Sequence, residues 1–452
     1  MEVPPPGVTS DSEALAEFAR PLVRHHYSVG VVRLFVQLVL SAASSGRSAA
    51  ATLGLIAPLL PGPKQTPCAN AGRLWMLRVG LHELTCAKEV ADDWIWIMDH
   101  TLQLGSWKCL IIVGIRRSRW MEHRRPLEHE DVRLLALAPM EHSSGQAVKG
   151  ALLAAEKKTG VPRAITSDGG TDLKRGVELY REDDRQVAHV LDIKHKNALL
   201  LKKELEKDKR WASYVREANN TKLATTQTSL AFLTPPSLKT KGRYMNLDTL
   251  VGWGENVLRY LDDPRDHSEV KVDRQLVKKK LGWVRKYRGR LAQWSELLAV
   301  AQASEHYVRY EGFHRKAADE LREKLASLAT CRRSRRLQEG VLQFVFEQGS
   351  QAEPGERLIG SSEVLESIIG KYKRLQGMHS KGGMTAMLLS IGAIVCHKTV
   401  DTVAEALQRV KTIEVGQWCR QQLGITLQAQ RTIALAKEQK QDPKQLQPAQ
   451  SF

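Results

Sequence analysis

Three acidic residues are placed where they could act together on a phosphodiester bond. Asp99 closes the apolar run Trp94–Met98, Asp168 closes the run 161–167, and Glu366 lies in a stretch with helical character. Strand-end aspartates on adjacent strands bring two carboxylates together, and a glutamate from a helix across the sheet completes the group. Two Mg²⁺ ions held roughly 3.5–4 Å apart by such oxygen ligands serve the attacking and the leaving oxygen. We therefore expect a two-ion Mg²⁺ site here, for which Mn²⁺ could substitute.

Each of these acids also has an alternative interpretation. An unpaired charge after the apolar run before Asp99 would be costly, but a strand end that faces water needs no function. Asp168 is equally suited to a turn or a helix cap, with Asp172 as its rival, and Glu363 is the alternative third ligand. Asp168 follows Asp99 by 69 residues and precedes Glu366 by 198. The second spacing predicts a long insertion before the glutamate.

The pattern Glu-Ser-x-x-Gly-Lys-x-Lys that begins at Glu366, with Asp99 and Asp168 before it, resembles the motifs of the DDE transposases of bacterial insertion sequences. The resemblance implies a ribonuclease-H-like catalytic domain in which the three acids are catalytic and bind the metal ions. It implies a DNA transposase that cuts at element ends and transfers strands into target DNA. Lys373, and Lys371 beside it, would contact DNA near the scissile bond, whereas a lysine facing solvent is the alternative.

The resemblance is incomplete, and two other functions stay open. Ser362 and Ile359 stand where some relatives carry a tyrosine and an arginine before the glutamate, so membership of that subgroup is not supported. One rival is another ribonuclease-H-like DNA nuclease of the resolvase type, against which the long insertion argues. The other is a non-catalytic, transposase-derived DNA-binding protein, against which the three retained carboxylates argue.

The composition fits a nucleic-acid partner. A chain of 452 residues with 42% apolar residues is long enough for two to four domains with sizeable cores. The net charge of +18 and the pI near 9.6 favour a polyanion, because phosphates neutralised by Lys or Arg release counterions. We expect DNA as the partner, as terminal inverted repeats and as target. We also expect at least a homodimer in the synaptic complex, since a synapse joins two ends.

Several classes of protein are disfavoured by missing patterns. The six cysteines form no CxxC pair, which argues against zinc fingers and disulfide scaffolds. The sequence contains no GxxxxGK[ST] motif, so we do not expect ATP-driven chemistry. The N-terminus lacks the features of a signal peptide, and the apolar stretches 28–43 and 49–61 are too interrupted or too short to span a membrane. We expect a cytoplasmic, nucleoid-associated bacterial protein.

The order of elements predicts an α/β fold, a ribonuclease-H-like mixed sheet interrupted by a mainly helical insertion. Strands are predicted at 93–100, 108–116, 132–138, 163–167 and 187–192, and helices at 144–158 and 193–207. The predicted parts are a disordered segment 1–12, a helical DNA-binding region 13–90, catalytic core 91–207, insertion 208–358, further core 359–400, C-terminal helices 401–432 and a disordered tail 433–452. In the DNA-binding region, the Ser- and Gly-containing turn at 44–48 fits a helix-turn-helix as well as an ordinary helical hairpin.

Two further segments are candidates for contacts with DNA. Seven of the thirteen residues from 278 to 290 are basic, and bases stacked on aromatic rings contribute about 1–3 kcal/mol each. The candidates there are Lys278, Lys279, Lys280, Trp283, Arg285, Lys286, Tyr287 and Arg288. The alternative is an amphipathic helix whose rings pack inward. His195 follows the strand-end Asp192 and could orient a carboxylate, contact DNA, lie near the metal or simply start a helix.

Overall fold

The computed structural model describes residues 16–23, 25–59, 66–104, 107–123, 125–237, 244, 247–263, 272–378, 384–425 and 427–436. The segment 1–12 and most of the tail 433–452, both predicted to be disordered, lie outside these residues. Within the described ranges, no helix is long and apolar enough to cross a membrane.

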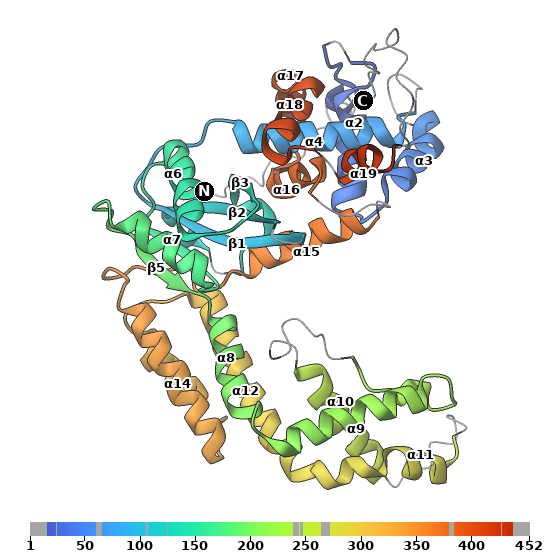
Figure 1. The fold of residues 1–452 in the computed structure, drawn as a ribbon, viewed down its shortest axis with the longest axis vertical. Coiled ribbons are helices and arrows are strands. Elements are labelled where there is room, and N and C mark those ends of the chain that lie inside the picture. Colours follow the sequence, from blue (N-terminus) through green and yellow to red (C-terminus); the bar gives the residue numbers. More distant parts are fainter. Residues whose placement is uncertain are drawn as a thin grey trace, which may run out of the picture.

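A five-stranded mixed sheet forms the core of the molecule (Figure 1). Its strands, in the spatial order β3-β2-β1-β4-β5, are β3 Arg133–Met140, β2 Trp107–Arg116, β1 Trp94–Leu104, β4 Ala164–Ser167 and β5 Ala188–Leu191. Antiparallel pairing joins β1 to β2 and β2 to β3, while β1, β4 and β5 run parallel. Helices α6 (Gly145–Thr159) and α7 (Thr171–Arg181) supply the crossovers that parallel strands need. This is the ribonuclease-H-like arrangement, so the predicted fold class is confirmed.

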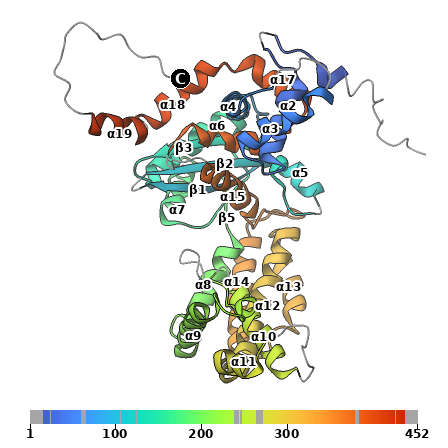
Figure 2. The ribbon, with the colours of Figure 1, turned by 90° about the vertical axis from the view of Figure 1, so that its right-hand side faces the viewer.

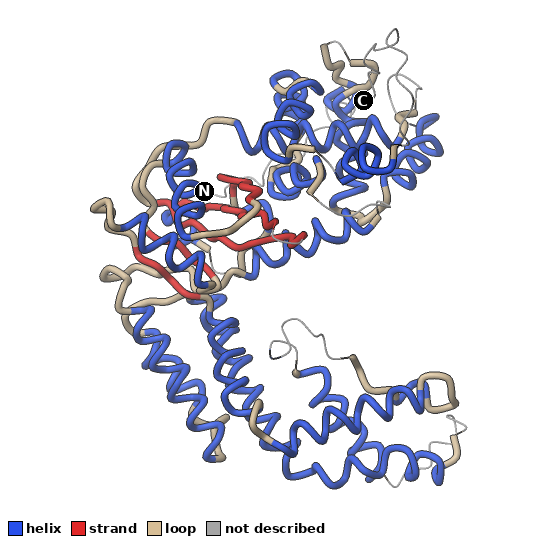
Figure 3. The backbone as a smooth tube through the Cα atoms, in the orientation of Figure 1, coloured by secondary structure: helices blue, strands red, loops and turns tan. Residues whose placement is uncertain are grey.

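Both faces of the sheet are covered by helices (Figure 3). This explains why β1 begins with five consecutive apolar residues instead of an alternating pattern. Side chains of one parity, which include Trp96, Met98 and Ile112, pack against α6 and α7. Side chains of the other parity, which include Ile97 and Ile111, join the main core beneath α15 (Glu363–Gly377).

The chain between β5 and α15 is mainly helical in its described part, as predicted. Its helices are α8 Ile193–Leu205, α9 Lys209–Thr225, α10 Asp248–Asp262, α11 Arg274–Leu281, α12 Arg288–Glu311, α13 Ala317–Leu325 and α14 Arg332–Gly349. Helices α8, α12 and α14 pack side by side and extend away from the sheet, and α9, α10 and α11 lie at their far end (Figure 1).

Helices from the two ends of the chain form one helical body (Figure 2). Its members are α2 Val29–Leu40, α3 Gly46–Ile56, α4 Ala69–Thr85, α16 Ser390–Val395, α17 Val400–Arg409 and α18 Thr412–Leu423, and α19 Leu427–Leu435 follows outside it. The long helix α4 packs against α16, α17 and α18. The Arg78 guanidinium donates to the Val410 carbonyl at 2.6 Å, and Gly80 lies so close to α16 that a Cβ there would overlap the Leu389 carbonyl. The predicted DNA-binding region is therefore packed on the C-terminal helices.

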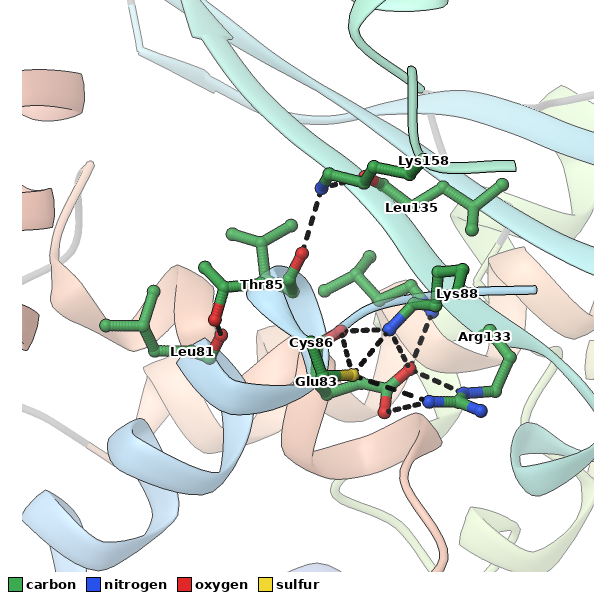
Figure 4. A network of polar contacts seen from close by, with 10 residues as sticks. Leu81, Glu83, Thr85, Cys86, Lys88, Arg133, Leu135 and Lys158 are labelled. Atoms are coloured by element: carbon green, nitrogen blue, oxygen red, sulfur yellow. Dashed lines mark hydrogen bonds and ion pairs between the residues drawn. The ribbon is translucent and has the colours of Figure 1, made fainter. Parts of the chain in front are cut away.

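A buried charge network joins α4 to the sheet (Figure 4). The Glu83 carboxylate of α4, with 4% of its side chain exposed, pairs with Lys88 at 3.3 Å and with Arg133 of β3 at 2.8 Å. Nearby, the Lys158 ammonium of α6 donates to the Leu84 carbonyl at 2.8 Å. Burial first, and then the charge of Lys88, lowers the pKa of Lys158 to about 8. Because Glu83 neutralises a fully buried lysine, this network fixes the helical body on the sheet.

Replacing Glu83 by alanine should destabilise the protein strongly. Glu83→Ala leaves the buried Lys88 ammonium without its counter-charge, and losing one member of a buried pair costs about 3–5 kcal/mol. Urea unfolding measures the change. Glu89→Ala is the matched control, since Glu89 is 70% exposed in its ion pair with Arg116 and surface pairs contribute about 0–1 kcal/mol. Equal, small losses in both variants would contradict this role of Glu83.

Candidate active site

The register of two parallel strands places Asp99 and Asp168 together. Ile97 of β1 lies opposite Thr166 of β4, and Asp99 and Asp168 each follow two residues later. Because alternate residues of a strand share a face, both carboxylates continue the face of Ile97 and Thr166. Neighbouring strands are about 4.8 Å apart. The two aspartates therefore start from adjacent backbone positions beneath α15.

Asp99 lies inside β1 and not at its end, which corrects the expectation from the sequence. The strand continues to Leu104 because β2 keeps pairing with it as far as Trp107. On the other side, the pairing of β1 with β4 stops at Ile97, since β4 itself ends at Ser167. Asp99 thus lies where β1 has a strand partner on one edge only.

The loop after β4 holds Asp168 in place. Its Oδ1 accepts a hydrogen bond from the Gly170 N–H at 2.8 Å, and Gly169 has a φ of +79°, a conformation that favours glycine. The rival acid Asp172 lies in the first turn of α7, where it faces Lys108 at 3.4 Å. Asp168 is thus the acid that the turn orients, and Asp172 is paired elsewhere.

The start of α15 is tied to the strand ends by hydrogen bonds. The Thr166 hydroxyl donates to the Ile359 carbonyl at 2.7 Å. The Asp192 carboxylate accepts from the Ser362 N–H at 2.7 Å and from its hydroxyl at 2.9 Å. Glu366 lies in the first turn that follows. These bonds set the position of the helix turn that carries Glu366 relative to the strand ends.

The two glutamates of α15 face different neighbours. Glu366 forms an ion pair with Lys194 at 2.6 Å, with 27% of the glutamate side chain exposed. Glu363 pairs with Arg309 of α12 at 2.9 Å and is more exposed, at 42%. The charge of Glu366 contributes to raising the pKa of the Asp99 carboxyl. Glu366, the less exposed of the two, is thus the glutamate whose charge acts on Asp99, and it stays the predicted third ligand.

The electrostatics bring the three acids into one group. Burial first, and then the negative charge of Asp168, raises the pKa of Asp99 to about 7, with a smaller contribution from Glu366. The hydrogen bond from the His100 N–H, at 2.6 Å, opposes this rise. A cluster that raises the pKa of one member in this way has excess negative charge, which a bound cation would relieve.

Hard carboxylate oxygens and excess negative charge suit a divalent cation such as Mg²⁺. In this conformation, however, no three His, Cys, Asp or Glu side chains of the described residues are grouped so that they could hold one ion. The Glu366 carboxylate is directed to Lys194 instead. The three acids fit the expected metal in chemistry, and Glu366 would have to leave Lys194 to join the aspartates.

His195 lies near these carboxylates in the first turn of α8. Its ring Nδ1 is 3.2 Å from the Asp192 carboxylate, which is 1% exposed. Burial lowers the pKa of His195, but the hydrogen bond and charge of Asp192, followed by the charges of Asp168 and Glu366, outweigh it and raise the pKa to about 9. His195 is therefore a cation at neutral pH, and Asp192 holds its ring.

The two lysines predicted on α15 have different surroundings. Lys373 lies on the exposed face of the helix, whereas Lys371 is half-buried. Burial first, and then the charges of Lys398 and Arg374, lowers the pKa of Lys371. Lys373 is thus the lysine that a DNA strand could reach without rearrangement. Its role there stays a prediction.

The aromatic residues of the segment 278–290 point inward. Trp283 and Tyr287 belong to the 3-10 helix η5 (Gly282–Tyr287), and Tyr287 is 2% exposed. The Tyr287 hydroxyl donates to Glu217 at 2.7 Å, and its ring packs edge-on against Tyr214. The Trp283 indole donates to Thr221 at 2.9 Å. The inward-packing alternative is what the structure shows, so the expected stacking of bases on these rings is corrected.

The cations of the same segment lie at its surface with different partners. Arg285 and Arg288 both pair with Asp262, and Lys286 approaches Glu217 at 3.8 Å. Lys278 and Lys279 are exposed and Lys280 is half-buried. Lys278 and Lys279 are therefore the members best placed to meet phosphate.

Sequence reasoning gave no role to Lys194, which the structure places on the carboxylate of Glu366. The available signal was its position, two residues after the strand-end Asp192 and next to His195. Helix α8 begins at Ile193, so a residue at 194 belongs to its first turn, beside the ends of the parallel strands.

Comparisons with known proteins give a remote similarity. The chain is similar to a chain of the Drosophila P element transposase strand transfer complex, with 9% sequence identity and a TM-score of 0.30, over 89% of this chain and 82% of that one. No protein-family model matches the chain, and no curated protein matches it.

Removing the two exposed lysines should affect DNA binding without affecting stability. Replacing both Lys278 and Lys279 by alanine should lower the salt dependence of DNA affinity by about 0.9 for each phosphate that is no longer neutralised. Tyr287→Ala should instead lower the free energy of unfolding by about 3–5 kcal/mol, as a buried aromatic truncation does. Filter binding at several salt concentrations and urea unfolding measure the two effects. An unchanged salt slope in the double variant would remove these lysines from the interface.

The histidine beside β4 should make the protein acid-sensitive. His189 Nε2 lies 2.9 Å from the Ser167 hydroxyl. Burial first, and then the charges of Arg181 and Lys174 against that of Glu178, lowers its pKa to about 4 from 6.5. Between pH 4 and pH 6.5, His189 therefore binds a proton more readily in the unfolded chain than in the folded protein. Stability should therefore fall as the pH drops from 6.5 to 4, by at most about 1.4 kcal/mol per pH unit.

The His189→Asn variant tests this dependence. Denaturant unfolding from pH 7 to pH 4 should give a shallower loss of stability than the wild type shows. His142→Asn, at an exposed position, controls for the loss of an imidazole elsewhere. A variant as acid-sensitive as the wild type would show that other groups cause the loss.

Proposed function

We propose that this chain is a DNA transposase of the DDE type, of the kind found in bacterial insertion sequences. It cuts the phosphodiester bond at the element ends and transfers the resulting strand into target DNA. The observation that supports the proposal is the strand register that sets Asp99 beside Asp168 on the sheet face covered by α15, the helix that carries Glu366. The two aspartates and the helix of Glu366 come from three segments distant in sequence on one side of the sheet, which supports the proposal.

The acidic side chains would bind metal, and the basic side chains near them would bind DNA. Asp99, Asp168 and Glu366 would hold two Mg²⁺ ions, which when bound activate the attacking oxygen and neutralise the leaving oxygen. Water then attacks the phosphodiester at the element end and releases a 3′-OH. That hydroxyl attacks a phosphodiester of the target strand and displaces the target's 3′-oxygen, which leaves as a 3′-OH, without a covalent intermediate on the protein. His195, kept positive by Asp192, and Lys373 on the exposed face of α15 would bind phosphate oxygens beside the reacting bond.

The remaining parts would bind the rest of the DNA. Residues 13–90 would bind the terminal inverted repeats through α2, α3 and the turn between them. Ser28 and Ser45 cap these two helices, accepting from the backbone N–H groups of Val31 and Ser48. A synapse contains two element ends, so we propose that at least two copies of the chain assemble on DNA.

Amide variants of the three acids test the proposal. Asp99→Asn, Asp168→Asn and Glu366→Gln should each lower Mg²⁺-dependent cleavage and strand transfer on end DNA by more than about a hundredfold, since losing even an outer-sphere partner costs 10- to 100-fold. Binding of the same DNA should persist. Glu363→Gln, one helical turn earlier, is the matched control and should stay within a few-fold of the wild type.

The outcomes separate the rival functions. Cleavage without any strand transfer would favour a nuclease of the resolvase type. A wild type that binds DNA but never cuts it with Mg²⁺ or Mn²⁺ would favour a non-catalytic DNA-binding protein. If Glu366→Gln stays active and Glu363→Gln does not, the third ligand is Glu363.

A further inference from the structure

Lys194 is placed on the carboxylate that the proposed function assigns to metal. Its ammonium lies 2.6 Å from Glu366 Oε2, and the two side chains are 29% and 27% exposed. The ion pair is half-buried, so solvent screens it less than it screens a surface pair.

Within the described chain, the two aspartates of the proposed site lack the cationic partner that Glu366 has. The positive His195 is paired with the buried Asp192, while Asp99 and Asp168 have no lysine or arginine partner among the described residues. Glu366 is thus the member of the three whose charge a lysine already balances. An ammonium and a divalent ion compete for the same carboxylate oxygens, because both need the charge and the lone pairs of Glu366.

We propose that Lys194 is a positioning residue that holds Glu366 while the metal is absent and must be displaced before Glu366 binds a divalent ion. The inference rests on the proposed function. A displaced ammonium gains a partner when DNA arrives, since a phosphate at the reacting bond would lie beside the three acids. Metal and DNA should consequently bind with positive coupling.

Binding of Mn²⁺ in the absence of DNA tests this inference. Titrations of the full-length protein, followed by electron paramagnetic resonance of free Mn²⁺, compare the wild type with Lys194→Met. A nearby charge shifts the affinity of a carboxylate for its proton by about one to three orders of magnitude. Lys194→Met should therefore bind Mn²⁺ about tenfold more tightly than the wild type. Adding end DNA should raise Mn²⁺ affinity more in the wild type than in Lys194→Met.

Two sets of controls make the result specific. Lys202→Met removes a lysine of the same helix that pairs with Glu206, and it should leave the Mn²⁺ affinity unchanged. In a Glu366→Gln background, Lys194→Met should give no gain, because the competing carboxylate is gone. Lys194→Gln is a second neutral variant, and circular dichroism checks that each variant is folded.

Equal or weaker Mn²⁺ binding by both neutral Lys194 variants, with a wild type that does bind Mn²⁺, would overturn this inference and leave the proposed function standing. Absence of Mn²⁺ binding by every variant, with and without end DNA, would instead overturn the metal site itself. A gain in affinity that persists in the Glu366→Gln background would show that Lys194 acts on another carboxylate, and this too would overturn the inference.

Discussion

The buried carboxylate of Asp192 joins the two ends of the helical insertion. On one side it caps α8, where it accepts from the His195 N–H at 2.8 Å. On the other side it accepts both hydrogen bonds of Ser362, immediately before α15. Burial raises the pKa of Asp192, but the hydrogen bond and charge of His195, with the Ser362 N–H, outweigh it and lower the pKa. A single charged group, 1% exposed, thus holds the strand end and the helix of Glu366 together.

Because Asp192 joins the two ends of the insertion, the chain can carry a long insertion next to a small site. The cost of closing a loop grows slowly with its length, by about 0.6 kcal/mol for each doubling, whereas the geometry at its base is set by local bonds. A hydrogen bond also joins helices α8 and α12, because the Asn197 amide of α8 donates to the Ala301 carbonyl of α12 at 3.0 Å.

The sequence predicted the parts of the fold that depend on local pattern. The five strands follow from apolar runs, and Asp168 directly after β4 follows from the polar residue that ends its run. The position of Asp99 inside β1 could not be predicted, because it depends on how far β2 pairs beyond it. The helix α7 received no predicted range, although the order of elements required one between β4 and β5.

Tertiary packing decided the features that local pattern left open. The pattern of the segment 278–290 fits both an exposed aromatic clamp and a packed surface, and the aromatic neighbours supplied by α9 and α12 decided for packing. Tyr287 meets Tyr214 and Trp294, which come from these two helices. The ion pair between Lys194 and Glu366 likewise joins the start of the insertion to the helix after it.

Anomalous diffraction at the manganese edge tests the central claim most directly. Crystals of the protein with end DNA and Mn²⁺ should give two anomalous peaks roughly 3.5–4 Å apart, coordinated by Asp99, Asp168 and Glu366, with the Lys194 ammonium moved off Glu366. Peaks held by other side chains, or no peak at these three carboxylates at saturating Mn²⁺, would contradict the account.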